Sequence, residues 1–224
     1  MRNLFLFVLL FAASATVSNA ERISVGRSPD EIKPQPSVVS PKAAENLIKN
    51  GGFEDGPHPE EWLTLTKGDR RLPDWIIAKG TVDLMSSSYL PAYKGDASLD
   101  LDGTMPGGVG QFIETVPGKT YRVSFAIAGN PLGEPKTKLL QVRIADKVID
   151  YKIHVTLSGN ARSIVWKHTH FNFVAKQKRY HLDFESMDEE ETCGPMIDEV
   201  EVTLAPSGPE APSNPELHKK SPVL

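Results

Sequence analysis

The sequence predicts an all-β sandwich or jelly roll. Between Glu45 and Leu204 apolar residues recur with a period of two, and no stretch of ten or more residues keeps a helical stripe. Turn residues separate short strand-like runs at intervals of about 8 to 12 residues, which is typical of two-sheet all-β domains. An α/β fold is excluded because no segment remains for its helices.

The composition is that of a soluble globular protein. The chain has 224 residues, 39% of them hydrophobic and 24% charged, with a formal net charge of -4. These values exclude collagen, coiled coils and polytopic membrane proteins. No basic block is longer than a pair, so the positive stripe that phosphate binding requires is missing and nucleic acid is not expected as a partner.

Both ends of the chain read as segments outside the folded domain. Residues 1–20 carry Arg2, an apolar run and a terminal Ser18-Asn19-Ala20, the pattern of a cleaved signal peptide. We therefore expect a secreted protein, extracellular or in the cell envelope, with no membrane insertion after cleavage; retention of the apolar run as an anchor is the alternative. Residues 21–44 read as a disordered linker and 206–224 as a Pro-rich disordered tail, which leaves 45–205 as the sandwich domain.

The strands follow from alternation. Within 120–129 Tyr121, Val123, Phe125 and Ile127 share one face. Earlier in the chain, Trp62 falls in a polar loop over 57–71, Trp75 is expected in the core, and 107–110 (Gly-Gly-Val-Gly) is expected to be a turn. The remaining expected strands centre on Val142 and Ile144, on Ile149 to Leu157, on Phe171 and Phe173, on Tyr180 to Phe184 and on Val200 to Leu204.

Two aspartates stand out on one predicted strand. Asp100 and Asp102 face one side, whereas Leu99 and Leu101 face the other. Two carboxylates on one face can bind a cation or accept hydrogen bonds from sugar hydroxyls, although a solvated face is the commoner reason for such a pair. Glycosidases need carboxyls that face each other across the scissile bond, about 5 to 9.5 Å apart, which neighbours on one strand do not provide. We therefore expect no enzyme activity.

Aromatic residues supply the other candidates for binding. Trp166 shares a strand face with His168 and His170, and a flat ring there can stack on a sugar. Tyr89 and Tyr93 lie in a loop rich in Ser and Gly and form a second candidate rim. The two histidines also suggest a metal site, but no third ligand is apparent, and an ordinary exposed pair is favoured.

A single thiol and two isolated acids complete the candidates. Cys193 has no partner for an intramolecular disulfide and is expected to be buried and inert, since a nucleophile needs a nearby histidine and an orienting carboxylate. Glu54 follows a Gly-Gly turn, and Asp198 opens the last strand on the face of Val200 and Val202. Such carboxylates need a partner, and capping of backbone N–H groups or pairing with Lys and Arg is one solution. No phosphate loop, His-Glu-x-x-His, Gly-x-Ser-x-Gly or Cys-x-x-Cys motif is present.

Several motifs resemble a known family. Residues 46–54 (NLIKNGGFE) resemble the first strand and turn of galactose-binding-like jelly rolls, which include many non-catalytic carbohydrate-binding modules. Further matches lie at 72–75, 82–84, 95–103, 111–112, 117–121, 125–131 and 194–200. Together these motifs resemble the bacterial choice-of-anchor C domain and the related plant cell-wall domain-of-unknown-function family 642. The plant branch carries further cysteines that this chain lacks.

The resemblance implies a galactose-binding-like jelly-roll β-sandwich that binds a cell-wall or extracellular polysaccharide without catalysis. The alternative is a structural or protein-interaction module of the envelope or matrix, with an extracellular protein as partner. The resemblance also implies a structural calcium ion held by Glu54, Asp198 and backbone carbonyls of the loop that includes Lys94, because calcium takes six to eight oxygen ligands.

Overall fold

The computed structural model describes residues 45–134, 136–155, 162–189 and 192–206. The chain divides into residues 1–42 and 43–224, and every described residue lies in the second part. The expected signal peptide, the linker and, apart from residue 206, the tail lie outside the described residues. In the described ranges no helix is long and apolar enough to cross a membrane.

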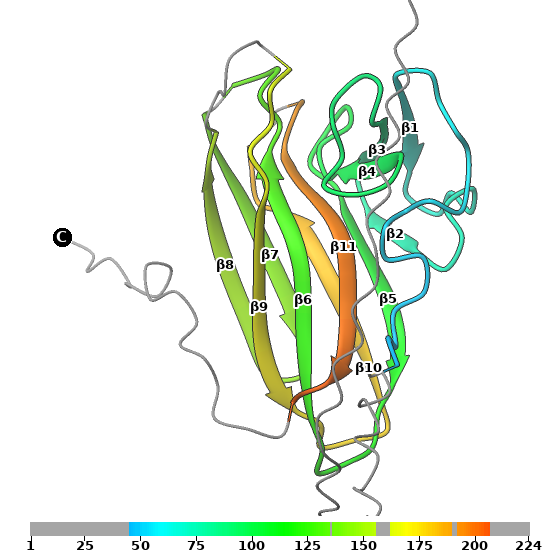
Figure 1. The fold of residues 1–224 in the computed structure, drawn as a ribbon, viewed down its shortest axis with the longest axis vertical. Helices are drawn as coiled ribbons and strands as arrows, with labels where there is room; N and C mark the ends of the chain where they lie inside the picture. Colours follow the sequence, from blue (N-terminus) through cyan, green and yellow to red (C-terminus); the bar gives the residue numbers. More distant parts are fainter. Residues whose placement is uncertain (1–44, 135, 156–161, 190–191, 207–224) are drawn as a thin grey trace, which may run out of the picture. The chain divides into compact units, whose positions relative to one another are not determined.

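Eleven strands make up the described part of the chain (Figure 1). They are β1 (Trp62–Thr66), β2 (Ile76–Lys79), β3 (Thr81–Ser86), β4 (Ala97–Asp100), β5 (Gly108–Glu114), β6 (Thr120–Gly129), β7 (Thr137–Ile144), β8 (Lys147–His154), β9 (Lys167–Val174), β10 (Arg179–Ser186) and β11 (Pro195–Leu204). The expected strand over 120–129 is confirmed, and the other expected strands appear with somewhat different ends. The expected strand end at Leu157 lies outside the described residues, and β4 ends at Asp100, before Asp102.

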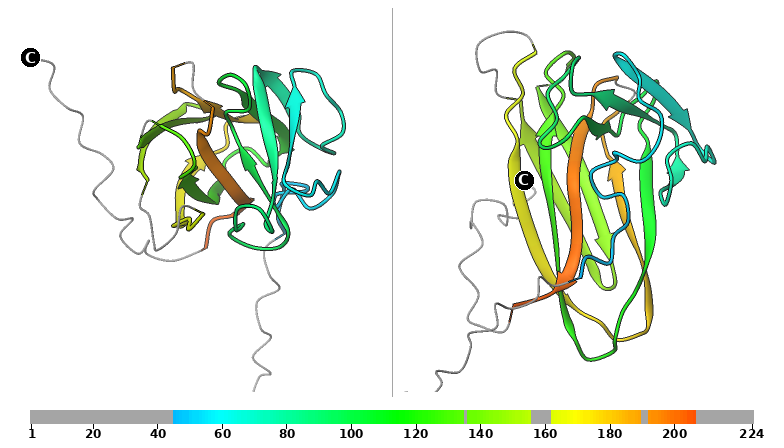
Figure 2. Two further views of the ribbon diagram at one scale, coloured as in Figure 1. Left: turned by 90° about the horizontal axis from the view of Figure 1, so that it is seen from above. Right: turned by 45° about the vertical axis from the view of Figure 1, so that its right-hand side comes forward.

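The strands form two antiparallel sheets that face each other (Figures 1 and 2). The six-stranded sheet has the order β1-β3-β4-β11-β6-β9, and the five-stranded sheet has the order β2-β5-β10-β7-β8. Each sheet turns one face to the core and one outer face away from it. The predicted all-β sandwich is therefore confirmed.

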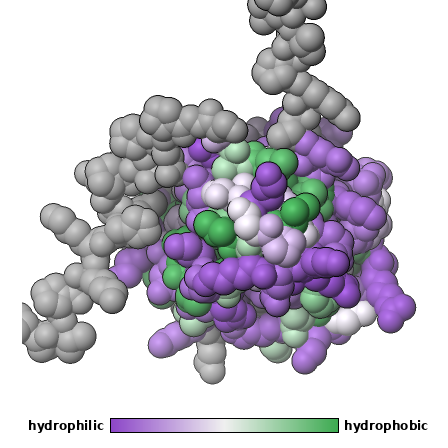
Figure 3. Space-filling view, turned by 90° about the horizontal axis from the view of Figure 1, so that it is seen from below, coloured by the Kyte–Doolittle hydropathy of each residue, from purple (hydrophilic) through white to green (hydrophobic). Residues whose placement is uncertain are grey.

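Aromatic side chains from both sheets meet in the core. The ring of Phe125 on β6 packs edge-on against Phe184 on β10, with centroids 5.0 Å apart. Trp75 contacts both Phe184 and Phe53 and is only 4% exposed, which confirms its expected place in the core. At the end where β9 and β11 finish, the apolar Val174 and Leu204 stay half exposed, and apolar patches interrupt a polar surface there (Figure 3).

Two local expectations were wrong. The turn expected at 107–110 is instead the start of β5, where Val109 is fully buried and pairs with Phe184. A Cβ on Gly110 would lie 2.4 Å from Cε1 of His181, so this glycine serves close packing on the sheet rather than a turn. The loop expected over 57–71 contains the edge strand β1, which pairs with β3 through long-range hydrogen bonds that no local pattern reports.

Candidate functional site

The loop 87–96, between β3 and β4, crosses the outer face of the six-stranded sheet. Its Leu90 is fully buried in a small apolar cluster with Met85, Ala128 and Met196, and this cluster lies on the opposite side of the sheet from the main core. The N–H groups of Tyr89 and Leu90 donate to the Ser86 carbonyl, each at 3.0 Å. The loop is thus anchored to the sheet, which fixes its aromatic side chains in place.

Tyr93, Trp166 and His168 lie together beside this loop. The Tyr93 ring centroid is 6.3 Å from that of Trp166 and 6.1 Å from that of His168, on which it stacks. The Trp166 indole N–H donates to the Pro91 carbonyl at 2.9 Å, which fixes the ring against the loop. Tyr93 is 43% exposed, so this group presents aromatic surface to solvent.

Tyr89 belongs to a second aromatic group on the same loop. Its ring lies 5.0 Å from that of Trp62, which is 44% exposed on the edge strand β1. The Arg162 guanidinium carbon lies 4.5 Å from the Tyr89 ring centroid. The structure therefore brings the two separate aromatic candidates together, since Trp166 packs against the loop that carries Tyr89 and Tyr93. It adds Trp62, which sequence reasoning missed because β1 meets β3 only in the folded sheet.

We call the five residues Trp62, Tyr89, Tyr93, Trp166 and His168 the aromatic surface. His168 is exposed as expected, whereas His170 is only half exposed. Within the described residues no group of three or more His, Cys, Asp or Glu side chains could hold a metal ion by the geometry of those side chains alone.

Glu54 and Asp198 hold the other end of the loop 87–96 to the sandwich. Glu54 Oε1 accepts hydrogen bonds from the N–H groups of Asp96 at 2.9 Å and Ala97 at 3.1 Å. Asp198 accepts from the N–H of Lys94 at 3.0 Å and from that of Glu199 at 2.6 Å. Both carboxylates thus cap backbone N–H groups, which is one of the two roles that the sequence left open.

Asp198 does not share the face of Val200 and Val202, so that expectation was wrong. A bulge in β11 between Asp198 and Glu201, with Glu199 at φ 46°, shifts the alternation. Asp198 pairs with Ala126 on the outer side of the six-stranded sheet, whereas Val200 and Val202 lie in the core. Burial raises the pKa of Asp198 to about 7, even though its hydrogen bonds from backbone N–H groups oppose the shift.

Carboxyl-bearing side chains lie near one another around Gly52. A Cβ on Gly52 would lie 2.9 Å from Glu199 Oε1 and 3.9 Å from Asp198 Oδ1, and the Glu54 side chain is also adjacent at 3.6 Å. Side chains of three carboxyl-bearing residues therefore lie next to Gly52. Lys94 provides competing charge, because its ammonium donates to Glu199 Oε2 at 2.7 Å. Carboxylate oxygens are the ligands that calcium prefers.

Asp100 and Asp102 are buried, so the solvated face expected for them was wrong. They are 1% and 0% exposed, so neither carboxylate can contact a sugar at the surface. Asp100 accepts from Asn130 Nδ2 at 2.6 Å and from the N–H groups of Asp102 and Gly194 at 2.8 and 2.9 Å. Loops from several strands cover this end of the sheet, which strand alternation cannot reveal.

The surroundings of Cys193 do not favour a role as a nucleophile. Cys193 is half buried, has φ 72°, and lies just before β11. Burial raises the pKa of its thiol, and the negative charge of Asp100 acts in the same direction. The thiol is therefore protonated at neutral pH, whereas a cysteine nucleophile needs a lowered pKa.

Two proteins of Arabidopsis thaliana are similar in sequence to most of this chain. Protein TEEBE of Arabidopsis thaliana is 29% identical over 178 residues, which cover 71% of this chain and 46% of that protein. Protein DUF642 L-GALACTONO-1,4-LACTONE-RESPONSIVE GENE 2 of the same plant is 26% identical over 174 residues, covering 70% and 46%. The chain thus spans about half the length of these relatives.

Among solved structures, TmCBM61 in complex with β-1,4-galactotriose superposes with a TM-score of 0.45 at 16% identity, covering 72% of this chain and 100% of that one. Residues 46–203 match the family described as "Protein of unknown function (DUF642)", and this range holds ten of the strands and nearly all of the eleventh. The resemblance seen in the sequence is thereby confirmed: the chain belongs to the DUF642 family.

Proposed function

We propose that this protein is a secreted, non-catalytic module that binds a cell-wall or extracellular polysaccharide through the aromatic surface. The observation that carries the proposal is the gathering of Tyr93, Trp166 and His168 beside one anchored loop. Aromatic rings contact the apolar faces of sugars, and rings held in place lose little conformational entropy on binding. The half-exposed Trp62 extends this surface along the same sheet.

The Trp166→Ala variant is expected to lose at least about tenfold in affinity for the polysaccharide, equivalent to about 1.4 kcal/mol. The change removes a ring and also the hydrogen bond to Pro91 that fixes the loop. Trp166→Phe keeps a ring but loses that bond and should bind with intermediate affinity. Retention on a panel of neutral insoluble polysaccharides, followed by titration with a soluble form, measures the effect.

Val148→Ala is the matched control, because Val148 is 61% exposed on the five-stranded sheet and its truncation also removes apolar surface. It should bind as the unchanged protein does. Failure of the unchanged protein to bind any polysaccharide in the panel, together with purification of a specific extracellular protein partner, would refute the proposal and support the protein-interaction alternative.

We also propose that calcium binds between the loop 87–96 and β11, with Glu54 and Asp198 as carboxylate ligands. The ion would tie the loop that carries Tyr89 and Tyr93 to the sandwich, and its chemistry there is structural. This proposal is supported by the carboxyl oxygens of Asp198 and Glu199 near Gly52 and by the Glu54 carboxyl group beside Gly95. Backbone carbonyl oxygens near Lys94 would complete the coordination that calcium requires.

Calcium at a hundredfold excess over its dissociation constant is expected to raise the unfolding midpoint by roughly 5–10 °C, because a ligand that binds only the folded state stabilises it. Glu54→Gln should abolish most of this shift. Asp55→Asn alters the neighbouring exposed carboxylate and should leave the shift intact. Thermal unfolding with calcium and with EDTA tests this, and an equal midpoint in both conditions would exclude the ion.

A further inference from the structure

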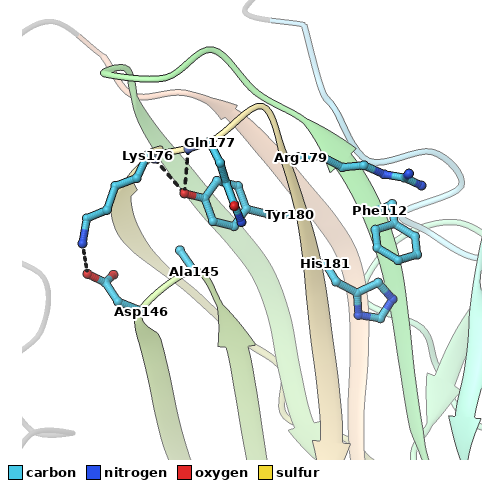
Figure 4. Close-up of a pocket in the computed structure, with 8 residues that line it drawn as sticks. All are labelled: Phe112, Ala145, Asp146, Lys176, Gln177, Arg179, Tyr180 and His181. Carbon is cyan, nitrogen blue, oxygen red and sulfur yellow. Dashed lines mark hydrogen bonds and ion pairs between the residues drawn. The ribbon is translucent and has the colours of Figure 1, made fainter.

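A cavity of about 610 Å³ opens on the five-stranded sheet, which does not carry the aromatic surface (Figure 4). Its walls come from the strands β5 and β10, from the β7–β8 turn and from the β9–β10 turn. The volume falls within the range of roughly 300–1,000 Å³ that is usual for small-ligand sites.

Side-chain contacts hold the two turns of this cavity in place. The Tyr180 hydroxyl accepts hydrogen bonds from the N–H groups of Lys176 at 2.7 Å and Gln177 at 3.2 Å. The Lys176 ammonium donates to Asp146 Oδ2 at 2.9 Å and so links the β9–β10 turn to the β7–β8 turn. The walls are therefore formed before any ligand arrives.

Phe112, Arg179 and His181 form a stack at the open side. The Arg179 guanidinium carbon lies 4.2 Å from the Phe112 ring centroid, and the His181 ring lies 4.4 Å from it. His181 is fixed by Asp183, at 2.8 Å from Nδ1, and rests over Gly110, which has no side chain to displace it. Phe112 still exposes 49% of its surface, so the stack offers both apolar area and a cation.

The charge of the lining favours an anionic ligand. The lining carries two cations, Lys176 and Arg179, against one carboxylate, Asp146, so it has one positive charge in excess. Glu114 lies outside the lining, 3.4 Å from Arg179 Nε, and the two side chains are 76% and 60% exposed. An exposed ion pair of this kind contributes little to stability. The Arg179 guanidinium can therefore donate a bidentate pair of hydrogen bonds to a ligand carboxylate.

We propose that this cavity is a second saccharide site, which takes a sugar residue that carries a carboxylate, that is, a uronic acid. The sugar ring packs on the Phe112–Arg179 stack while its carboxylate binds the Arg179 guanidinium. This inference goes beyond the proposed function, because the cavity lies on the five-stranded sheet and its ligand is charged. The cavity and the aromatic surface have in common only that both would bind a saccharide.

Calorimetric titration of the purified protein with a galacturonic acid oligomer tests the inference, with a galactose oligomer of equal length as the neutral match. We expect the acidic oligomer to bind at least about tenfold more tightly than the neutral one, and less tightly as salt is raised. Arg179→Gln should lose roughly tenfold in affinity, and Arg179→Lys should recover only part of it. Arg70→Gln, an exposed arginine in the β1–β2 connection, removes the same charge and should have no effect.

Three results would overturn the inference. The galacturonic acid oligomer could bind Arg179→Gln as tightly as the unchanged protein, or the neutral oligomer could bind as tightly as the acidic one. An aspartate oligomer could also bind as tightly as the galacturonic acid oligomer, which would point to acidic peptides as ligands. Trp166→Ala separates this site from the aromatic surface. If Trp166→Ala abolishes uronate binding while Arg179→Gln does not, the proposed function stands and this inference fails. If only Arg179→Gln abolishes uronate binding, and neutral polysaccharides do not bind at all, this inference stands and the proposed function fails. An unchanged unfolding midpoint shows that Arg179→Gln folds.

Discussion

Replacing Lys138 with methionine is expected to lower the free energy of unfolding by about 1–3 kcal/mol at pH 8, because the change removes a buried positive charge that acts on the buried Asp102 carboxylate. Lys138 and Asp102 are both 0% exposed. Among the described residues, neither the ammonium of Lys138 nor the carboxylate of Asp102 has a hydrogen-bond partner. Burial raises the pKa of Asp102 to about 7, and the charge of Lys138 acts to lower it. The Ser186 hydroxyl also lowers this pKa, although it does not reach hydrogen-bond geometry.

Urea denaturation at pH 8 and pH 5 measures this effect. The loss should be smaller at pH 5, where a protonated Asp102 needs no cation. The double variant Lys138→Met/Asp102→Asn should recover most of the stability, because it removes both charges together. Lys152→Met, on the exposed side of β8, is the control and should change stability by less than about 0.5 kcal/mol. A Lys138→Met variant as stable as the unchanged protein at both pH values would contradict an electrostatic effect of Lys138 on Asp102.

The second large effect concerns pH. The free energy of unfolding is expected to fall by about 2–4 kcal/mol as the pH rises from about 4 to about 7. Burial raises the pKa of Asp100 from 3.8 to about 7, more than the hydrogen bond from Asn130 and those from backbone N–H groups lower it. In this window the folded protein keeps a proton that the unfolded chain has released. The stabilisation is therefore complete below the ordinary aspartate pKa and is lost as the pH passes the folded one.

Asp100→Asn should flatten this dependence, since asparagine keeps an acceptor oxygen but does not titrate. Asp102 contributes in the same direction, so part of the slope should remain. Asp150→Asn changes an exposed carboxylate on β8 and should leave the slope as it is. Unfolding free energies measured by urea denaturation across this range give the comparison. Stability that rises from pH 4 to 7 would show that these carboxyls are not buried in the folded protein.

Much of the fold could be predicted from the sequence because strand alternation is a local property. The alternation in β6 identified its buried face, and the same reasoning placed Phe171 and Phe173 of β9 on the side of the core cluster. Prediction failed where glycines and bulges break that periodicity. Gly108 and Gly110 lie within β5, and the bulge beside Asp198 turns this side chain to the outer face.

The candidate site was only partly predictable. Tyr89 and Tyr93 could be nominated because they lie in a polar loop, and Trp166 because it shares a predicted strand face with two histidines. Their contact with Trp62 and His168 depends on the pairing of β1 with β3 and of β6 with β9, which joins residues far apart in the chain. The cavity beside Arg179 was missed altogether, because it needs two turns and two strands from separate parts of the sequence.

The sequence by itself determined the fold class, the family and the presence of loop aromatics, since each of these rests on composition, period or short motifs. Only the tertiary structure decided which polar groups are buried. Asp100 and Lys138 lie on β4 and β7, and Asp102 follows β4; strand alternation tells the two faces of a sheet apart, but whether a face meets water depends on what covers it. Whether a side chain is covered by a distant loop or by the opposite sheet depends on residues far apart in the sequence. This burial sets the protonation states of the buried carboxyl groups and decides which surfaces stay exposed to a ligand.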